Sequence, residues 1–227
     1  MCREIGVRLI ELNKIYNMDC LDFMRELPDK SIDLILTDPP YGINIAKSGT
    51  VGGGSLAKTK DYGASDWDRA IPEKQVFEEM FRVSKNQIIF GGNYFVEHLT
   101  NSSCWLVWDK NNTGNFADCE LAWTSFKTAV RKFEYTWNGF IQGDMKNKEE
   151  RIHPTQKPLP LFEWILNNYS KEGDVILDPF SGSGTTAIAC HRLKRDFVCV
   201  ERDEGYYNDS VKRLEKERSQ TTIFDFI

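Results

Sequence analysis

The sequence has no long uninterrupted hydrophobic run and few of the residues that commonly bind metals. No apolar stretch approaches the roughly 20 residues of a membrane-spanning helix. No apolar region follows the first four residues either, so we expect neither a membrane span nor a secretory signal. Three histidines and six cysteines occur, without a Cys-x-x-Cys pair. Their scattered positions favour reduced thiols over disulfides, and we expect no bound metal.

Internal repeats and long low-complexity tracts are also missing. A chain of 227 residues can bury a full core, and we predict a single domain over residues 1–227. Short apolar segments typical of strands alternate with amphipathic segments typical of helices. A strand or hairpin is expected at 9–17, and strands at 32–36, 87–90, 104–108, 120–126, 130–137, 175–177 and 197–200. Helices are expected at 20–27, 72–83, 159–169, 185–193 and 204–217. This alternation predicts an α/β fold with a mostly parallel sheet covered on both faces.

The net charge of −5 argues mildly against a nucleic-acid partner, because a DNA-binding domain usually carries a basic surface. Residues 127–157 depart from this balance, with seven Lys and Arg against four Asp and Glu. A basic face on an acidic protein is compatible with phosphate contacts, but an ordinary solvated surface explains the same charges.

One strand end carries residues suited to binding an amine. The apolar run 32–36 ends in Thr-Asp-Pro-Pro-Tyr-Gly at residues 37–42. Pro39 and Pro40 stiffen this turn, Asp38 supplies a carboxylate, and Tyr41 offers a ring on which a flat group can stack. An ordinary turn is the alternative interpretation of such a short motif.

A second strand end is typical of a nucleoside-binding loop. The run 175–177 ends in Asp-Pro-Phe-Ser-Gly-Ser-Gly-Thr at residues 178–185, where Gly182 and Gly184 let the backbone lie close to a ligand. Glu201 ends the next predicted strand about 20 residues later, where an acid binds ribose hydroxyls. The third glycine of the dinucleotide fingerprint is missing, which disfavours a dinucleotide-dependent oxidoreductase without excluding it.

Together, and in this order, the two motifs resemble the β class of DNA amino-methyltransferases that use S-adenosylmethionine. The resemblance spans about residues 18–214. It implies the Rossmann-like, mostly parallel seven-stranded sheet of class I methyltransferases, with the catalytic half before the cofactor half. It also implies methyl transfer to the N6 amine of adenine in a short duplex DNA site, after the base has flipped out.

The resemblance leaves alternatives for the substrate. Aspartate in the first position of the catalytic motif goes mainly with adenine, and serine with cytosine, so a cytosine-N4 enzyme is the second candidate. Related enzymes with Asn-Pro-Pro-Tyr act on RNA or protein amides and are less favoured. A DNA-binding protein without catalysis is a further alternative, but the intact motifs give no reason to prefer it.

The resemblance also assigns the cofactor site. Asp19 and the backbone of Cys20 would pair with the adenine edge of the cofactor, with Phe180 packed nearby. The segment 153–158, His-Pro-Thr-Gln-Lys-Pro, is similar to the family's cofactor-proximal motif, which would lie near the methionine end. The predicted cofactor-binding residues are Asp19, Cys20, Asp38, Thr155, Gln156, Lys157, Asp178, Phe180, Ser181, Gly182, Ser183, Gly184, Thr185, Thr186, Glu201 and Arg202.

The predicted catalytic residues are Asp38, Pro39, Pro40 and Tyr41. A base amine is a poor nucleophile because its lone pair is delocalised into the ring. The Asp38 carboxylate and the Pro39 carbonyl can accept hydrogen bonds from the two N–H groups of the amine, which frees its lone pair. Stacking on Tyr41 helps to offset the cost of flipping the base. Most of the acceleration is expected from positioning, without a covalent enzyme intermediate.

Recognition of the DNA sequence is predicted for a small insertion at 127–151, where basic and aromatic residues are interleaved. An edge hairpin whose aromatic rings belong to the core is the alternative. The glycine-rich loop 47–68 is a second candidate. The predicted DNA-binding residues are Lys47, Lys58, Lys60, Lys127, Arg131, Lys132, Lys146, Lys148 and Arg151.

The tail 219–227 is unusually apolar for residues that follow a charged helix. Gln220, Ile223 and Phe226 resemble a sliding-clamp-binding peptide, and packing on the protein's own domain or on a second subunit is the alternative. Double-stranded DNA is thus the expected partner, with a sliding clamp and a homodimer as further candidates. We expect a cytoplasmic, nucleoid-associated protein.

Overall fold

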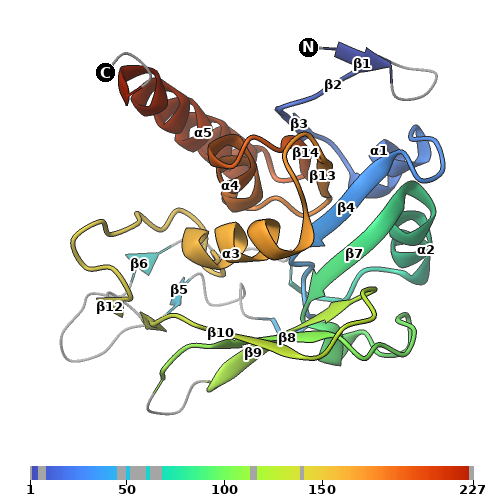
Figure 1. Cartoon of the computed structure of the whole chain (residues 1–227), viewed down its shortest axis with the longest axis horizontal. Helices are drawn as coiled ribbons and strands as arrows, with labels where there is room; N and C mark the ends of the chain where they lie inside the picture. Colours follow the sequence, from blue (N-terminus) through green and yellow to red (C-terminus); the bar gives the residue numbers. More distant parts are fainter. Residues whose placement is uncertain are drawn as a thin grey trace.

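The computed structural model describes residues 2–4, 9–44, 50–51, 60–61, 68–112, 117–138 and 141–224. Its main sheet has the strand order β10-β8-β9-β7-β4-β13-β14-β3 (Figure 1). In chain order these strands are β3 (Lys14–Asn17), β4 (Ile32–Thr37), β7 (Ser84–Phe90), β8 (Trp105–Asp109), β9 (Cys119–Thr124), β10 (Arg131–Glu134), β13 (Val175–Asp178) and β14 (Asp196–Glu201).

All main-sheet strands except β9 run in the same direction. β9 pairs antiparallel with β7 and β8, and every other neighbouring pair is parallel. The predicted α/β fold with a mostly parallel sheet is therefore confirmed. The predicted strand number of seven is wrong, because the main sheet has eight strands, ending at one edge with β10, which pairs with β8. This mostly exposed strand covers the backbone groups that β8 would otherwise leave open.

Two-stranded antiparallel ribbons lie outside the main sheet. Their pairs are β1 (Cys2–Glu4) with β2 (Leu9–Glu11), β5 (Thr50–Val51) with β6 (Lys60–Asp61), and β11 (Trp137–Asn138) with β12 (Ile141–Gln142).

Helices cover both faces of the sheet. They are α1 (Cys20–Arg25), α2 (Lys74–Val83), α3 (Leu159–Tyr169), α4 (Thr185–Arg192) and α5 (Glu204–Phe224), with a short 3₁₀ turn, η1 (Gly92–Tyr94). In Figure 1, α1 and α2 lie on one side of the central strands, and α3, α4 and α5 on the other. None of the helices in the described part of the chain is long and apolar enough to cross a membrane.

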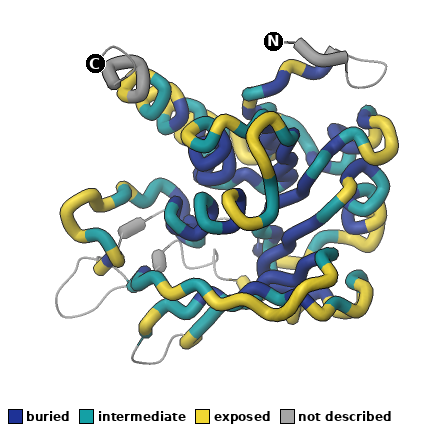
Figure 2. The backbone as a smooth tube through the Cα atoms, in the orientation of Figure 1, coloured by how far each residue is buried: buried dark blue, intermediate teal, exposed yellow. Residues whose placement is uncertain are grey.

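The apolar residues of β4 explain this layering. Leu34 and Leu36 belong to the core formed with α3 and α4, whereas Ile35 belongs to the core formed with α1 and α2. Alternate side chains of a strand point to opposite faces, so a strand that is apolar throughout is buried from both sides. Figure 2 shows the central strands buried and the outer strand β10 largely exposed.

Several element boundaries differ from the predicted ones, and those of β7 and α5 bear on the site and the tail. β7 begins at Ser84, directly after α2, although the strand was expected from residue 87. The early residues of β7 pair with β4, and their polar side chains hide the strand in the sequence. α5 continues to Phe224 beyond the predicted end at 217, so the predicted tail peptide begins inside a helix. The side chain of Ile223 and all of Phe226 lie outside the described residues.

Candidate active site

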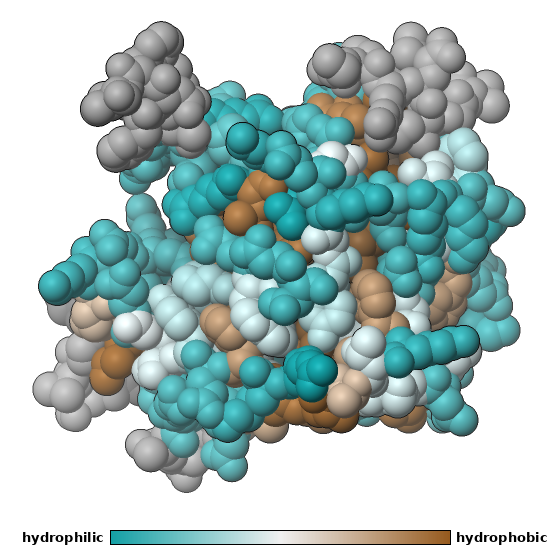
Figure 3. All heavy atoms as spheres, in the orientation of Figure 1, coloured by the Kyte–Doolittle hydropathy of each residue, from teal (hydrophilic) through white to brown (hydrophobic). Residues whose placement is uncertain are grey.

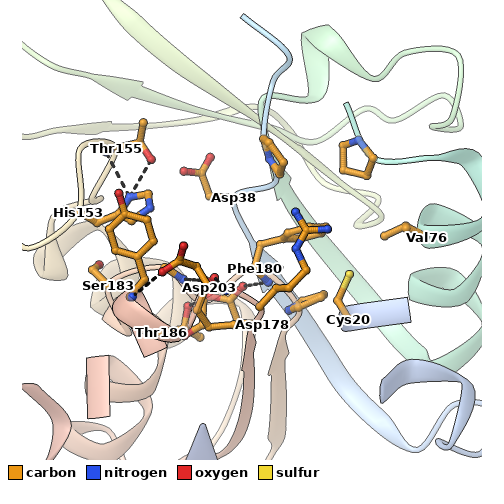
Figure 4. A pocket seen from close by; sticks show the side chains of 18 of the residues that line it. Cys20, Asp38, Val76, His153, Thr155, Asp178, Phe180, Ser183, Thr186 and Asp203 are labelled. Carbon is orange, nitrogen blue, oxygen red and sulfur yellow. Dashed lines mark hydrogen bonds between the residues drawn. The ribbon is translucent and has the colours of Figure 1, made fainter. Parts of the chain in front are cut away.

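Both motif turns open into one cleft at the carboxyl ends of β4, β13 and β14. β4 and β13 are parallel neighbours, so the turns that follow them lie next to each other. The Thr37 hydroxyl donates to Asp178 Oδ1 over 2.7 Å and joins the two strand ends. The cleft encloses about 890 Å³. Figure 4 shows Asp38 between Thr155 on one side of the cleft and Val76 on the other.

The cofactor loop after β13 is shaped by its backbone. Gly182 and Gly184 have φ angles of 49° and 73°, which glycine adopts without a steric penalty. The Gly182 N–H donates to Glu201 Oε2, and the Asp203 N–H donates to Glu201 Oε1, both over 2.8 Å. Burial raises the pKa of Glu201 above its ordinary value, although these backbone donors oppose the change. The loop thus fixes the carboxylate that is predicted to bind the ribose.

Asp178 supports the loop from inside the protein. Its carboxylate accepts hydrogen bonds from the hydroxyls of Thr37 and Thr186 and from the Phe180 N–H. Desolvation raises the pKa of Asp178 to about 6, against the effect of these donors. Because its oxygens are used in this way, Asp178 positions the loop rather than offering a free carboxylate.

The predicted cofactor-binding residues lie together. Every one of them lines the cleft except Gly184, which is the N-cap of α4. Asp19 caps α1, with its Oδ1 accepting from the Leu21 N–H over 2.8 Å. Burial and the neighbouring Asp19 raise the pKa of Cys20 to about 12, so Cys20 is a neutral thiol.

The 153–158 segment lines the cleft, but its side chains bond to their own loop or to Asp38, whereas the prediction placed them at the methionine end of the cofactor. His153 is buried and neutral, since burial and the nearby Lys157 lower its pKa to about 3. The Gln156 side chain accepts from the Ile152 N–H over 3.0 Å and donates to the Glu150 carbonyl over 3.2 Å, so its amide holds its own loop. Thr155 is also used within this loop, because its N–H donates to His153 Nδ1 over 3.3 Å and its hydroxyl lies 3.2 Å from the same nitrogen (Figure 4).

Asp38 is engaged by two side chains at the acceptor end of the cleft. The Tyr41 hydroxyl donates to Asp38 Oδ1 over 2.5 Å, and the Lys157 ammonium donates to Asp38 Oδ2. The Lys157 ammonium also lies 3.1 Å from Glu120 Oε2. Burial raises the pKa of Asp38; the Lys157 charge opposes the rise and the Glu120 charge adds to it. Burial by itself would lower the pKa of Lys157, but the two carboxylates raise it.

The Asp-Pro-Pro-Tyr turn is held from both sides. Asp68 Oδ1 accepts from the N–H groups of Tyr41 and Gly42 over 2.8 and 2.9 Å. At Gly91, which has φ of 69°, a Cβ would lie 2.1 Å from Tyr41 Cε1, so only glycine lets this backbone approach the ring. Tyr94 stacks on Tyr41 with ring centroids 4.8 Å apart, and the Tyr94 residue is itself exposed. Tyr94 therefore covers one face of the ring that was expected to meet the base.

The predicted DNA-binding residues do not line this cleft. Lys127, Arg131, Lys146 and Lys148 are exposed, and Lys132 forms ion pairs with Glu134 and Asp109. Lys47, Lys58 and the Lys60 side chain lie outside the described residues.

Arg151 is not a free surface cation. Its guanidinium lies over the Trp137 ring at 4.3 Å, with Nε and Nη2 buried. This packing argues against the prediction that Arg151 contacts DNA in the present arrangement.

The predicted recognition insertion at 127–151 overlaps the main sheet, since it contains β10. Phe133 and Tyr135 are partly buried against the core formed with α3 and α4, and the Trp137 indole donates to the Gln156 carbonyl over 2.9 Å. For these rings the alternative interpretation, an edge segment packed on the core, agrees with the structure. Phe140 lies outside the described residues.

Several residues of the site escaped the sequence analysis. Glu120 comes from β9 and reaches the Asp38 turn only because β9 folds back beside β7. Asp68 and Tyr94 contact the turn from distant segments. Arg213 of α5 donates to the Ser183 carbonyl and to Glu149, which ties the cofactor loop to the 144–152 segment. The Gly-Gly-Asn-Tyr sequence after β7 was the one available signal, because paired glycines at a strand end indicate close packing.

Comparison with known proteins identifies the family. The family model described as a DNA methylase, N6_N4_Mtase, matches residues 97–212, more than half of the chain. The chain belongs to this family. The match covers the cofactor loop and Glu201, whereas Asp19, Cys20 and the Asp38 turn precede it in the sequence.

Individual relatives match along nearly the whole chain. The Type II methyltransferase M2.DpnII of Streptococcus pneumoniae is 27% identical over 89% of this chain and 90% of its own. Among solved structures, the M1.HpyAVI–SAM complex has a TM-score of 0.56 at 23% identity, covering 88% of this chain and 99% of its own. The PvuII DNA methyltransferase, named as cytosine-N4-specific, has a TM-score of 0.58 at 17% identity, covering 96% and 94%. The two structures support the fold of this methylase.

Proposed function

We propose that this DNA methylase transfers a methyl group from S-adenosylmethionine to the N6 amine of adenine in a short duplex site, acting on a flipped-out base. The observation that carries the proposal is the shared cleft, because Asp38, Gly182 of the cofactor loop and Glu201 at the end of β14 line one cavity. An amine and a nucleoside cofactor would then lie next to each other. The cofactor is supported by the M1.HpyAVI complex, which contains SAM.

The cleft suits the cofactor in size and chemistry. Its volume of about 890 Å³ is within the range of small-ligand pockets. Phe180 and Val76 supply apolar walls for an adenine ring, and the fixed Glu201 oxygens suit ribose hydroxyls. When bound, S-adenosylmethionine supplies an electrophilic methyl group on sulfur.

Asp38 is proposed to accept a hydrogen bond from the target amine, with the Pro39 carbonyl as the second acceptor. These two acceptors draw the nitrogen towards tetrahedral geometry and expose its lone pair. After the nitrogen has gained the methyl group, its proton leaves to Asp38 or to water. Burial helps at this point, because the raised pKa of Asp38 makes it a better proton acceptor than an exposed aspartate.

The experiment that tests the proposal is incubation with methyl-tritiated S-adenosylmethionine and duplex DNA, followed by digestion and identification of the labelled nucleoside. We expect label on N6-methyl-2′-deoxyadenosine. Label on N4-methylcytosine would correct the base, an alternative kept open by the cytosine-N4-specific PvuII enzyme. No labelled nucleoside would overturn the proposal.

The surface that binds duplex DNA is proposed to include the exposed Lys127, Arg131, Lys146 and Lys148, together with Lys47, Lys58 and Lys60. Figure 3 shows hydrophilic residues over most of this face of the molecule, with smaller hydrophobic areas between them. Replacing the four exposed residues with Gln should weaken DNA binding and reduce its salt dependence. Unchanged affinity and salt slope would remove this surface from the proposal.

The tail and the oligomeric state are separate proposals. Gln220 is exposed near the end of α5, which leaves it accessible to a sliding clamp. Mixing purified clamp with the full chain and with a 1–218 variant tests this, and equal binding would remove the idea. Sedimentation of the full chain would show whether it forms the homodimer considered above.

A further inference from the structure

Four buried or half-buried charged side chains of alternating sign form a chain at the acceptor end of the cleft. Lys110 pairs with Glu120 Oε1, Glu120 Oε2 faces Lys157, and Lys157 pairs with Asp38. The members come from four segments: the ends of β8 and β4, the start of β9, and the loop before α3. The two positive and two negative charges cancel. Lys157 lies between the carboxylates of Glu120 and Asp38, so it can change its partner within the cluster.

In this arrangement, Lys157 occupies the position that a target amine needs. Its ammonium contacts Asp38 Oδ2, while the Tyr41 hydroxyl already occupies Asp38 Oδ1. The Lys157 side chain is 7% exposed, and its Nζ lies 5.7 Å from the centre of the Tyr41 ring and 5.3 Å from that of Phe90. A base amine that binds Asp38 Oδ2 must therefore compete with this ammonium for the same oxygen.

Electrostatics give a second reason for displacement. The target nitrogen becomes positively charged as it gains a methyl group. A lysine ammonium in contact with the same carboxylate would repel that developing charge, more strongly in a buried site than in water. The ammonium must be held elsewhere during transfer.

Glu120 offers the nearest alternative partner for Lys157. Glu120 Oε2 is 3.1 Å from Lys157 Nζ, is buried, and makes no aligned hydrogen bond with a described residue in this arrangement. This contact is already an ion pair, and a small movement of the flexible lysine side chain would align a hydrogen bond to Glu120.

We propose that Glu120 is a positioning residue that takes over the Lys157 ammonium when a base amine binds Asp38, so that the Lys157–Asp38 pair is a resting state. This inference rests on the proposed methyl transfer. Glu120 acts through Lys157 and does not itself contact the base.

Variants of the two residues test the inference through their interaction. Glu120→Gln leaves Lys157 with Asp38 as its one anionic partner, so we expect single-turnover methyl transfer at saturating substrates to slow by roughly 10- to 100-fold. The Kd for S-adenosylmethionine should stay within about threefold of wild type. The double variant Glu120→Gln/Lys157→Met should be no slower than Lys157→Met alone, because no ammonium remains to block Asp38. Glu78→Gln, which removes an exposed carboxylate paired with Lys74 on α2, is the matched control and should transfer at the wild-type rate.

The outcomes separate this inference from the proposed function. A wild-type protein that labels no DNA overturns the proposed function. A wild-type protein that labels DNA, with Glu120→Gln equally fast or with losses that multiply in the double variant, overturns only the role of Glu120.

A structure of the wild-type protein provides a test without variants or turnover. The chain would be crystallised with duplex DNA and sinefungin, an unreactive analogue of the cofactor. With the base amine on Asp38, we expect Lys157 Nζ to be hydrogen-bonded to Glu120 and out of contact with Asp38. Lys157 still on Asp38 beside the bound base would contradict the inference.

Discussion

The two halves of the cleft hold their functional groups by different means. On the cofactor side, backbone N–H groups fix Glu201, and buried hydroxyls fix Asp178. On the acceptor side, Asp38 is held by the Tyr41 hydroxyl and by the Lys157 ammonium. Backbone contacts leave little freedom, whereas a lysine side chain can change its partner. We infer that the cofactor side is preformed and that the acceptor side rearranges when the base arrives.

Removing the Asp38 carboxylate should have the largest effect and should be confined to the acceptor half. For Asp38→Ala we expect methyl transfer to slow by roughly 10³-fold, because the amine loses its charged acceptor. Calorimetric titration with S-adenosylmethionine should give a Kd within about threefold of wild type. A large loss of cofactor affinity would show that the two halves are not separate.

Titration of Asp178 should reveal the cost of burying its carboxylate beneath the cofactor loop. Its pKa is raised to about 6 in the folded protein, compared with an ordinary value near 3.9. The folded state therefore holds this proton more tightly, and the stability that the proton provides is full below about pH 4 and lost as pH rises through 6. The loss amounts to about 3 kcal/mol in the free energy of unfolding.

Urea unfolding of the wild type and of Asp178→Asn between pH 4 and 7 measures this effect. The difference in free energy of unfolding between the two proteins should shift by that amount, in favour of the variant as pH rises. A pH-independent difference would mean that Asp178 titrates normally.

Two glycines allow the packing around Tyr41 to be tested with a matched control. Gly91 and Gly173 have φ angles of 69° and 80°, but a Cβ at Gly91 would collide with Tyr41, whereas a Cβ at Gly173 has nothing within 4 Å. Gly173→Ala should lower the free energy of unfolding by about 1 kcal/mol through backbone strain alone. Gly91→Ala should cost roughly 2 kcal/mol more, because Tyr41 must move. It should also slow methyl transfer, and equal effects of the two substitutions would argue against a packed Tyr41.

The smallest effect is expected for Glu201→Ala, which tests the cofactor half alone. Loss of the proposed ribose contacts should raise the Kd for S-adenosylmethionine roughly tenfold or more. Transfer at saturating cofactor should change little. Glu215→Ala, at an exposed position of α5, is the control. A slower rate at saturation without a change in Kd would place Glu201 in the acceptor half.

The fold could be predicted because its signals are local. The apolar run of β4 and the strand–loop–helix sequence around Gly182 each indicate structure from a few neighbouring residues. The strand predicted at 130–137 is shorter in the structure, because β10 spans four mostly exposed residues whose extent is set by pairing with β8 rather than by the local pattern.

The same difference between local and tertiary signals decides which site residues could be predicted. Residues of the cofactor loop were predictable because their spacing is fixed within one strand–turn–helix unit and the following strand. Glu120, Tyr94 and the position of Lys157 depend on how distant segments meet at Asp38. Such contacts follow from tertiary packing, so a motif predicts the carboxylate but not the charges that surround it.

The most direct test of the central claim, that one cleft brings a base amine to an activated methyl group, is a crystal structure with the unreactive cofactor analogue and duplex DNA. We predict the nucleoside part between Asp19 and Glu201, and a flipped adenine with its N6 hydrogen-bonded to Asp38. The position of the transferable group should face N6 at about 3 to 3.5 Å. A cofactor arm directed away from Asp38, or a base bound outside this cleft, would contradict the claim.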